Sequence, residues 1–195
     1  MTPAARSADD DVIRHGDHPE PSGPLHARAT RMDAIELLIS QHDEVDALIE
    51  AIENATDGKA KEAAFVELAD KLAAHATIEE KLFYPAVMAK QTEDQLLESV
   101  EEHLAIKRLL ADLLELDIDD DKFDAKLSVM KEGIEHHARE EEEAELFPKV
   151  QKLLDADELA GLGNEMLVMF ETLMRGAPRQ QVPSETSEAA PLPPV

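Results

Sequence analysis

A pattern of histidine and glutamate side chains occurs twice in this chain. Each copy is a lone histidine followed by a His-x-x-x-Glu pair: His42, His75 and Glu79 in the first copy, and His103, His137 and Glu141 in the second. Equivalent residues lie 61 or 62 positions apart. Imidazole and carboxylate groups four residues apart lie on one face of a helix, so both can point at the same ion. Six ligands that converge suggest a site for two metal ions.

The available donor atoms narrow the choice of metal. The chain has no cysteine, which excludes disulfides, zinc-thiolate sites and iron–sulfur clusters. Imidazole nitrogen and carboxylate oxygen suit iron, manganese or zinc. One histidine on an apolar helix face is usually a buried residue with a hydrogen-bond partner. Burying four imidazoles and two carboxylates together without a cation would cost on the order of several kcal/mol. A pair of cations would remove this penalty.

Apolar residues at helical spacing predict the elements that would position these ligands. The predicted stretches are Ile35 to Ile52, Lys59 to about Tyr84, Leu96 to Leu113, Leu127 to Pro148, and a shorter fifth from about Asp157 to Arg175. No segment shows the sustained alternation of a strand. Short connections between four long amphipathic helices favour an all-α, up-and-down antiparallel four-helix bundle with a short fifth C-terminal helix. Such a bundle would bring the six side chains together.

Proline content marks the expected domain boundaries. Nine of the eleven prolines lie before residue 30 or after residue 176. Proline-rich polar segments bury too little apolar surface to offset the cost of ordering the chain. We therefore expect disordered tails at residues 1–30 and 176–195 around a bundle with its C-terminal helix at 31–175. His15, His18 and His26 lie in the first tail and are expected to be bystanders.

The charge balance bears on partners and location. The chain has 44 acidic and 19 basic residues and a formal net charge of −25. This charge repels phosphate backbones and anionic lipids, so we expect no nucleic-acid or membrane partner. The first residues lack an apolar signal core, and no apolar run approaches the roughly 18 residues of a membrane helix. We expect a soluble cytoplasmic protein, and its protein partners are open.

The ligand order carries a family resemblance. Ferritin-like sites use Glu-x-x-His, but no histidine of the folded region has an acidic residue three positions before it. The observed order, with Phe83-Tyr84-Pro85 and Leu146-Phe147-Pro148 closing the second and fourth helices, resembles the hemerythrin-like HHE cation-binding family over about residues 32 to 155. The resemblance implies that the four histidines bind two irons bridged by Glu79, Glu141 and an oxo or hydroxo group. Manganese and zinc fit the same donors.

Two departures from the family pattern concern the ligands. Oxygen-carrying hemerythrins have a second histidine four residues after the third-helix histidine, and Lys107 occupies that position here. One iron would then lack a protein ligand, which favours exchangeable small ligands, unless Lys107 points to solvent. Moreover, Glu79 precedes Pro85 by six residues, whereas Glu141 precedes Pro148 by seven. Either a bulge absorbs the extra residue, or Glu140 or Glu142 competes with Glu141; we expect Glu141.

The resemblance leads to three functional hypotheses. The first is a non-heme diiron protein that binds or reacts with O2, peroxide or nitric oxide, in sensing or oxidative-stress defence. The second is a catalase-like enzyme that decomposes peroxide. The third is a structural or interaction bundle without a catalytic metal, in which the histidines serve packing. The sequence assigns no catalytic side chain beyond the metal ligands.

Overall fold

The computed structural model describes residues 32–195. The tail predicted for residues 1–30, with His15, His18 and His26, lies outside the described residues. Among residues 32–195 the secondary structure is helical and contains no strand. The predicted all-α class is therefore confirmed.

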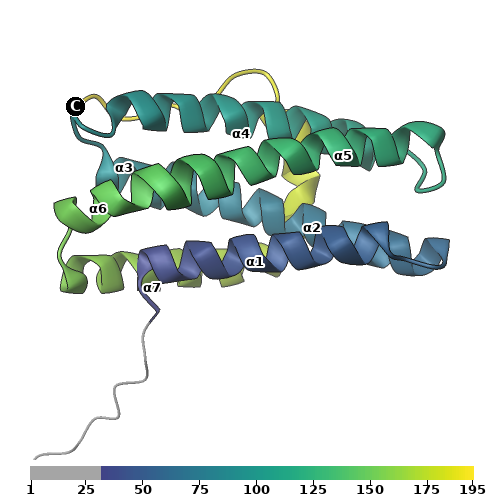
Figure 1. Cartoon of the computed structure of the whole chain (residues 1–195), viewed down its shortest axis with the longest axis horizontal. Coiled ribbons are helices and arrows are strands. Elements are labelled where there is room, and N and C mark those ends of the chain that lie inside the picture. The colour runs from purple at the N-terminus through teal and green to yellow at the C-terminus, as the bar shows by residue number, and fades with distance from the viewer. Residues whose placement is uncertain (1–31) are drawn as a thin grey trace, which may run out of the picture.

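Four long helical segments form the bundle (Figure 1). The first is α1 (Ala34–Glu53). In the second, α2 (Gly58–Ile78) continues through the π-helical η1 (Glu79–Phe83) into α3 (Tyr84–Val87). The third is α4 (Glu93–Leu114). In the fourth, α5 (Asp121–Glu135) continues through the π-helical η2 (His136–Leu146) into α6 (Phe147–Leu153). The predicted fifth helix is present as α7 (Ala156–Met174), and it packs beside α1.

Aspartate side chains cap the starts of four of these helices, among them α5, where Asp120 accepts from Lys122 N. Asp33 and Glu36 form a reciprocal capping box at α1, with Glu36 N donating to Asp33 Oδ1 at 2.9 Å and Asp33 N donating to Glu36 Oε2 at 3.1 Å. Asp57 accepts from Ala60 N at α2, and Asp155 caps α7. Such caps satisfy backbone N–H groups that a helix start leaves without partners. They allow the short turns that an up-and-down bundle needs.

The buried apolar residues form two clusters along the bundle. The first includes Leu38, Ile78, Val100 and Leu146, one from each helical segment. The second likewise includes Val45, Leu72, Leu110 and Ile134. Each segment carries one histidine between the two clusters, in keeping with the repeated spacing of the pattern: His42, His75, His103 and His137. A polar layer therefore crosses the middle of an otherwise apolar core.

The C-terminal segment differs from the sequence-based expectation. Residues 178–185 form the 3-10 helix η3 (Pro178–Glu185), and Val182 is buried against the bundle. Arg179 bonds to Asp70 on α2 through both its backbone N and its guanidinium. Proline restricts the unfolded chain as well as the folded one, which reduces the entropy lost on ordering. These contacts, which composition alone cannot reveal, hold the segment in place.

Gly163 allows α7 to pack closely on the start of α1. A Cβ atom at this position would lie 2.6 Å from Ala34 N and 2.7 Å from Met32 O, closer than real Cβ contacts. Gly163→Ala should therefore destabilise the protein by about 1–3 kcal/mol, since forced overpacking exceeds the gain of about 1 kcal/mol in helix propensity. Thermal unfolding measures this change. Gly161→Ala is the matched control, because a Cβ there has no neighbour within 4 Å and should stabilise the same helix.

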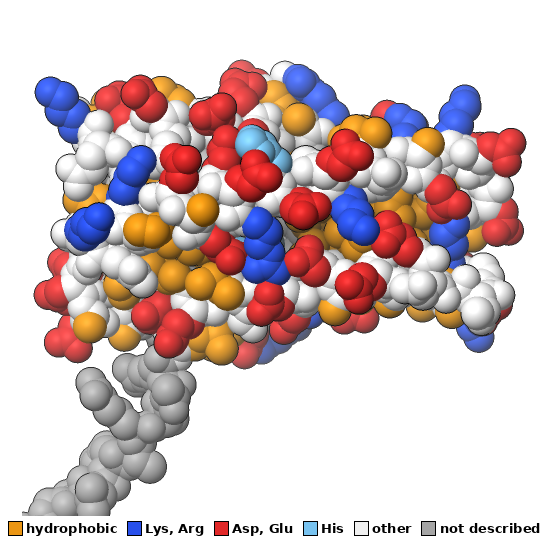
Figure 2. All heavy atoms as spheres, viewed as in Figure 1, with side chains coloured by type: hydrophobic (Ala, Val, Ile, Leu, Met, Phe, Trp, Pro, Cys, Tyr) orange, Lys and Arg blue, Asp and Glu red, His pale blue; other side chains and the backbone are white. Residues whose placement is uncertain are grey.

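The surface carries the acidic excess. Figure 2 shows acidic side chains spread over the whole of one face, with fewer basic ones among them. No helix within residues 32–195 is both long enough and apolar enough to cross a membrane.

Candidate metal centre

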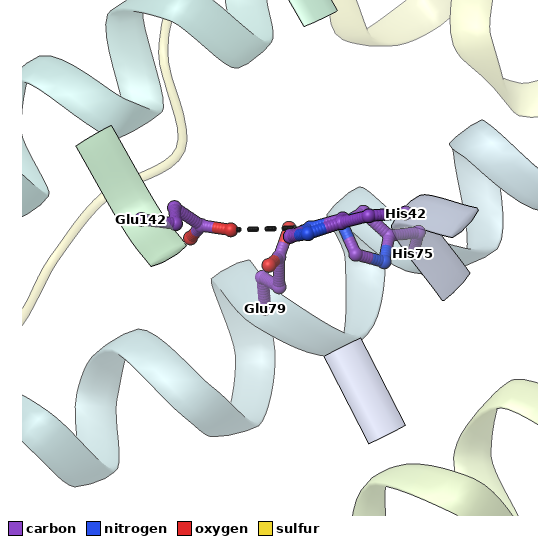
Figure 3. Close-up of side chains that lie close together, drawn as sticks. All are labelled: His42, His75, Glu79 and Glu142. Carbon is purple, nitrogen blue, oxygen red and sulfur yellow. Dashed lines mark ion pairs between the residues drawn. The ribbon is translucent and has the colours of Figure 1, made fainter. Parts of the chain in front are cut away.

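The polar layer brings together five of the six side chains expected to bind metal. His42, His75, Glu79, His103 and His137 are all buried and face one another inside the bundle. The sixth member of the cluster is Glu142, which is fully buried. Figure 3 shows Glu142 pointing from the opposite side of the bundle toward His42, with Glu79 and His75 beside it.

The six side chains form two groups that share one carboxylate. The first group is His42, His75, Glu79 and Glu142, and the second is Glu79, His103 and His137. Within each group the donor atoms lie within 4.8 Å of one another. Glu79 Oε2 lies 3.1 Å from His75 Nε2 and 3.3 Å from His103 Nε2. An ion held by either group would therefore lie beside Glu79.

Glu141 does not lie in this cluster, contrary to the sequence-based expectation. Its side chain contacts His136 Nε2 at 3.1 Å and lies with Glu102 at the surface of the bundle. The cause is η2, because the i→i+5 hydrogen bonds of a π-helix bring residues five apart onto one face. His137 is therefore followed on the inner face by Glu142, whereas His75, at the end of the α-helical α2, is followed by Glu79. Glu142 precedes Pro148 by six residues, the same offset as Glu79 from Pro85.

Each histidine ring is oriented by a hydrogen bond from Nδ1, the ring nitrogen that faces away from the cluster, to an oxygen atom of another side chain. The Nδ1 atoms lie 2.7 to 3.0 Å from these oxygens: His42 with Glu143, His75 with Gln41, His103 with Glu80 and His137 with Glu102. Carboxylate and carbonyl oxygens only accept hydrogen bonds, so Nδ1 carries the hydrogen in each ring. In the neutral form of each ring, which is the form that binds metal, Nε2 then has a free lone pair directed into the cluster. Metal-binding histidines are oriented in this way.

Several buried atoms of the cluster have no hydrogen-bond partner. Among the described residues these atoms are His42 Nε2, both carboxylate oxygens of Glu79, Glu142 Oε2 and, beside them, Gln41 Nε2. The Nε2 atoms of His103 and His137 approach to 3.0 Å, although both carry lone pairs. Buried polar atoms without partners cost free energy, and facing lone pairs repel. A cation between these atoms would satisfy them, so the donor set fits a metal.

Burial and neighbouring charges also shift the pKa values of side chains in the cluster. Burial, followed by the neighbouring carboxylate of Glu142, raises the pKa of Glu79 well above its usual value. Burial acts in the same direction on Glu142, but His137 and His42 outweigh it and lower the pKa of Glu142. Burial and the nearby His42 lower the pKa of His75. A neutral imidazole and a carboxylate are the forms that bind metal.

Tyr84 is a member of the site that the sequence analysis did not identify. Its hydroxyl donates to Glu142 Oε1 at 3.0 Å and lies 3.2 Å from His103 Nε2. The ring is fully buried, and burial followed by the charges of Glu142 and Glu79 raises the pKa of the phenol well above its usual value. The sequence held a signal, since Tyr84 belongs to the Phe83-Tyr84-Pro85 run that closes the second helix. The hydrogen bond from Tyr84 therefore fixes the position of the Glu142 carboxylate within the cluster.

Lys107 does not point to solvent. It is 7% exposed, and its Nζ lies 2.8 to 2.9 Å from both carboxylate oxygens of Glu80. Because Glu80 Oε1 also accepts from His103 Nδ1, Lys107 holds the carboxylate that orients His103. Burial would raise the pKa of Glu80, but His103 and Lys107 together lower it.

Comparison with known proteins identifies the family. Residues 33–150 match the family described as Hemerythrin HHE cation binding domain, which is more than half of the chain. The chain belongs to the hemerythrin HHE cation-binding domain family. The family resemblance predicted from the ligand order is therefore confirmed.

The hemerythrin HHE fold is also found in a similar solved structure. That structure is a hemerythrin HHE cation-binding domain-containing protein from Mycobacterium kansasii, with 25% sequence identity and a TM-score of 0.66. The similarity covers 79% of this chain and 94% of that chain. A comparison with curated proteins found no match. The buried histidine and glutamate cluster of this HHE domain offers donors that suit a cation.

Proposed function

We propose that this HHE domain binds two iron ions and that the ions bind or react with dioxygen, peroxide or nitric oxide, in sensing or in defence against oxidative stress. One observation carries the proposal. All four imidazoles are fixed by an oxygen at Nδ1 and turn Nε2 toward two buried carboxylates. The proposed ligands are His42, His75, Glu79, His103, His137 and, in place of Glu141, Glu142.

The two groups of donors differ in number, which supports a reactive site. The first group offers four ligand side chains and the second offers three, including the shared Glu79. A metal with few protein ligands keeps a position for an exchangeable ligand. Lys107, which stands where a further histidine would complete the second group, is bonded to Glu80 instead.

The protein residues supply orientation and shielding. Iron would supply redox chemistry and Lewis acidity at the centre. The acceptors at Nδ1 fix the tautomer and the orientation of the imidazoles, and Tyr84 holds a proton on its oxygen beside Glu142. Phe83 and Phe147 are buried next to the cluster, with the ring of Phe147 stacked 6.2 Å from His42, and they exclude water from that side. The site is therefore oriented in advance and shielded from water on that side.

A purely structural role accounts less well for the cluster. A histidine that serves packing normally finds partners for both ring nitrogens. Here the inner nitrogens face one another and face carboxylate oxygens that lack hydrogen bonds. Apolar residues of similar size would fill this layer at lower cost.

Iron reconstitution tests the proposed function. The chain is loaded with iron(II) without air and then exposed separately to dioxygen, hydrogen peroxide and nitric oxide. We expect new charge-transfer absorption with at least one of the three, and no such absorption in a His103→Ala variant. Zinc-loaded protein is the control, since zinc fits the same donors but has no redox chemistry. An iron-loaded protein whose spectrum none of the three changes would refute the proposed reactivity.

A further inference from the structure

A small apolar cavity adjoins the metal centre. Its volume is about 40 Å³, and all four histidines of the cluster contribute to its wall. The remaining wall is almost entirely apolar and includes Val45, Leu72 and Ile134. A cavity needs roughly 10–15 Å³ to hold one water molecule, so this one has room for a molecule of about two or three heavy atoms.

One part of the cavity wall comes from outside the four helical segments. That part is Val182 of η3, which is 1% exposed. Side chains three residues apart lie one above the other in a 3-10 helix. Arg179, Val182 and Glu185 therefore share the face of η3 that is turned toward the bundle, with the apolar residue between two charged ones.

The two charged residues hold η3 across a pair of helices. Arg179 Nη1 bonds to Asp70 Oδ2 on α2 at 2.5 Å, and Glu185 Oε2 lies 3.0 Å from Lys107 Nζ on α4. Just beyond η3, Arg108 donates to the carbonyl of Thr186 at 3.0 Å. Val182 is thus fixed over the space between α2 and α4, where His75 and His103 originate.

We infer that Val182 determines which ligands reach the metal centre, by closing the cavity to molecules larger than about three heavy atoms. This inference rests on the proposed function and specifies its substrate class: uncharged molecules of the size of dioxygen, nitric oxide or hydrogen peroxide. An apolar wall disfavours anions, because they lose hydration without gaining partners. The C-terminal segment is then part of the site.

The first test needs no metal. The metal-free full chain is studied by methyl NMR under dissolved dioxygen, whose paramagnetism speeds relaxation of nearby methyl groups. We expect the methyl groups of Val45 and Ile134 to relax several-fold faster than those of Leu68, which is fully buried but does not line the cavity. Val182→Phe should abolish the difference by filling the cavity. Equal relaxation of all three residues in the unaltered chain would overturn the inference.

The second test uses ligand size. Oxidation of the iron(II)-loaded protein is timed with hydrogen peroxide and with tert-butyl hydroperoxide. Val182→Ala should speed the reaction with tert-butyl hydroperoxide at least about tenfold, because one or two methylene groups give a discrimination of this size in a fitted pocket. The rate of the reaction with hydrogen peroxide should barely change. Val129→Ala on α5 is the matched control, since Val129 is 54% exposed.

The outcomes separate the inference from the proposed function. If Val182→Ala leaves the ratio of the two rates unchanged, the inference is overturned while the reactive centre stands. If the unaltered iron-loaded protein reacts with neither peroxide, the proposed reaction with peroxide fails, and the relaxation of the cavity methyl groups alone decides whether Val182 closes a cavity that admits small gases. Val182→Leu, a milder change, replaces Val182→Phe if the larger side chain prevents folding.

Discussion

Glu142→Gln should lower the iron content of the loaded protein from two ions per chain to one or fewer, whereas Glu141→Gln should leave it unchanged. Glu142 is fully buried, faces His42 at 3.4 Å and has an oxygen without a hydrogen bond. If Glu142 is a metal ligand as proposed, losing its carboxylate should cost more than the roughly 10–100-fold in affinity that loss of a supporting residue costs. Metal analysis after dialysis against a weak chelator measures the difference.

The two variants are matched controls for each other. Both remove one negative charge, from adjacent positions of η2, with almost no change in side-chain volume. The two side chains point in different directions, since Glu141 contacts His136 at the surface and Glu142 faces His42 inside the bundle. Equal iron content in the two variants, or a larger loss from Glu141→Gln, would show that the π-helical register does not select the ligand.

Glu79→Gln should raise the stability of the metal-free protein and lower that of the metal-loaded protein. Without metal, both oxygens of Glu79 are buried without hydrogen bonds and lie near Glu142. Removing the charge should increase the free energy of unfolding by about 1–3 kcal/mol. With metal the same change removes the shared ligand and with it the stabilisation by binding, about 4 kcal/mol when free metal is a thousand times Kd. Denaturant unfolding with and without a chelator measures both effects.

The gain in the metal-free protein should depend on pH in a fixed direction. Folding raises the pKa of Glu79, mainly through burial and then through Glu142, so the folded form binds its proton more tightly than the unfolded form. The destabilisation caused by the Glu79 charge is absent at pH values below the pKa that Glu79 has in the unfolded chain. It grows as the pH rises until the pH exceeds the pKa that Glu79 has in the folded protein. The advantage of Glu79→Gln should therefore increase as the pH rises. Glu62→Gln, an exposed change on α2, should show no such trend. A constant or opposite effect would contradict the account.

The sequence was sufficient to predict the bundle and to place five of the six candidate ligand side chains on its inner faces. Histidines at helical spacing within apolar stripes must lie on inner faces once four helices pack, so the positions of His42, His75, His103 and His137 followed from periodicity. The choice between Glu141 and Glu142 did not follow. An α-helical period places Glu141 below His137, and only the hydrogen bonding of η2 changes that register.

Other features depended on contacts between distant parts of the chain. Glu80 and Glu102 each orient a histidine on another helical segment, so no local pattern marks them as supporting residues. The C-terminal segment has the composition of a disordered tail, but Val182 and the Arg179–Asp70 pair fix it to the bundle. Composition measures how much apolar surface a segment has, whereas order depends on where that surface packs.

Iron-edge anomalous diffraction from crystals of the iron-loaded protein tests the central claim most directly. The account predicts two anomalous peaks inside the bundle, both beside Glu79, one near His42, His75 and Glu142 and the other near His103 and His137. A single peak, a peak at the surface group of Glu102, His136 and Glu141, or no peak within the bundle would contradict it.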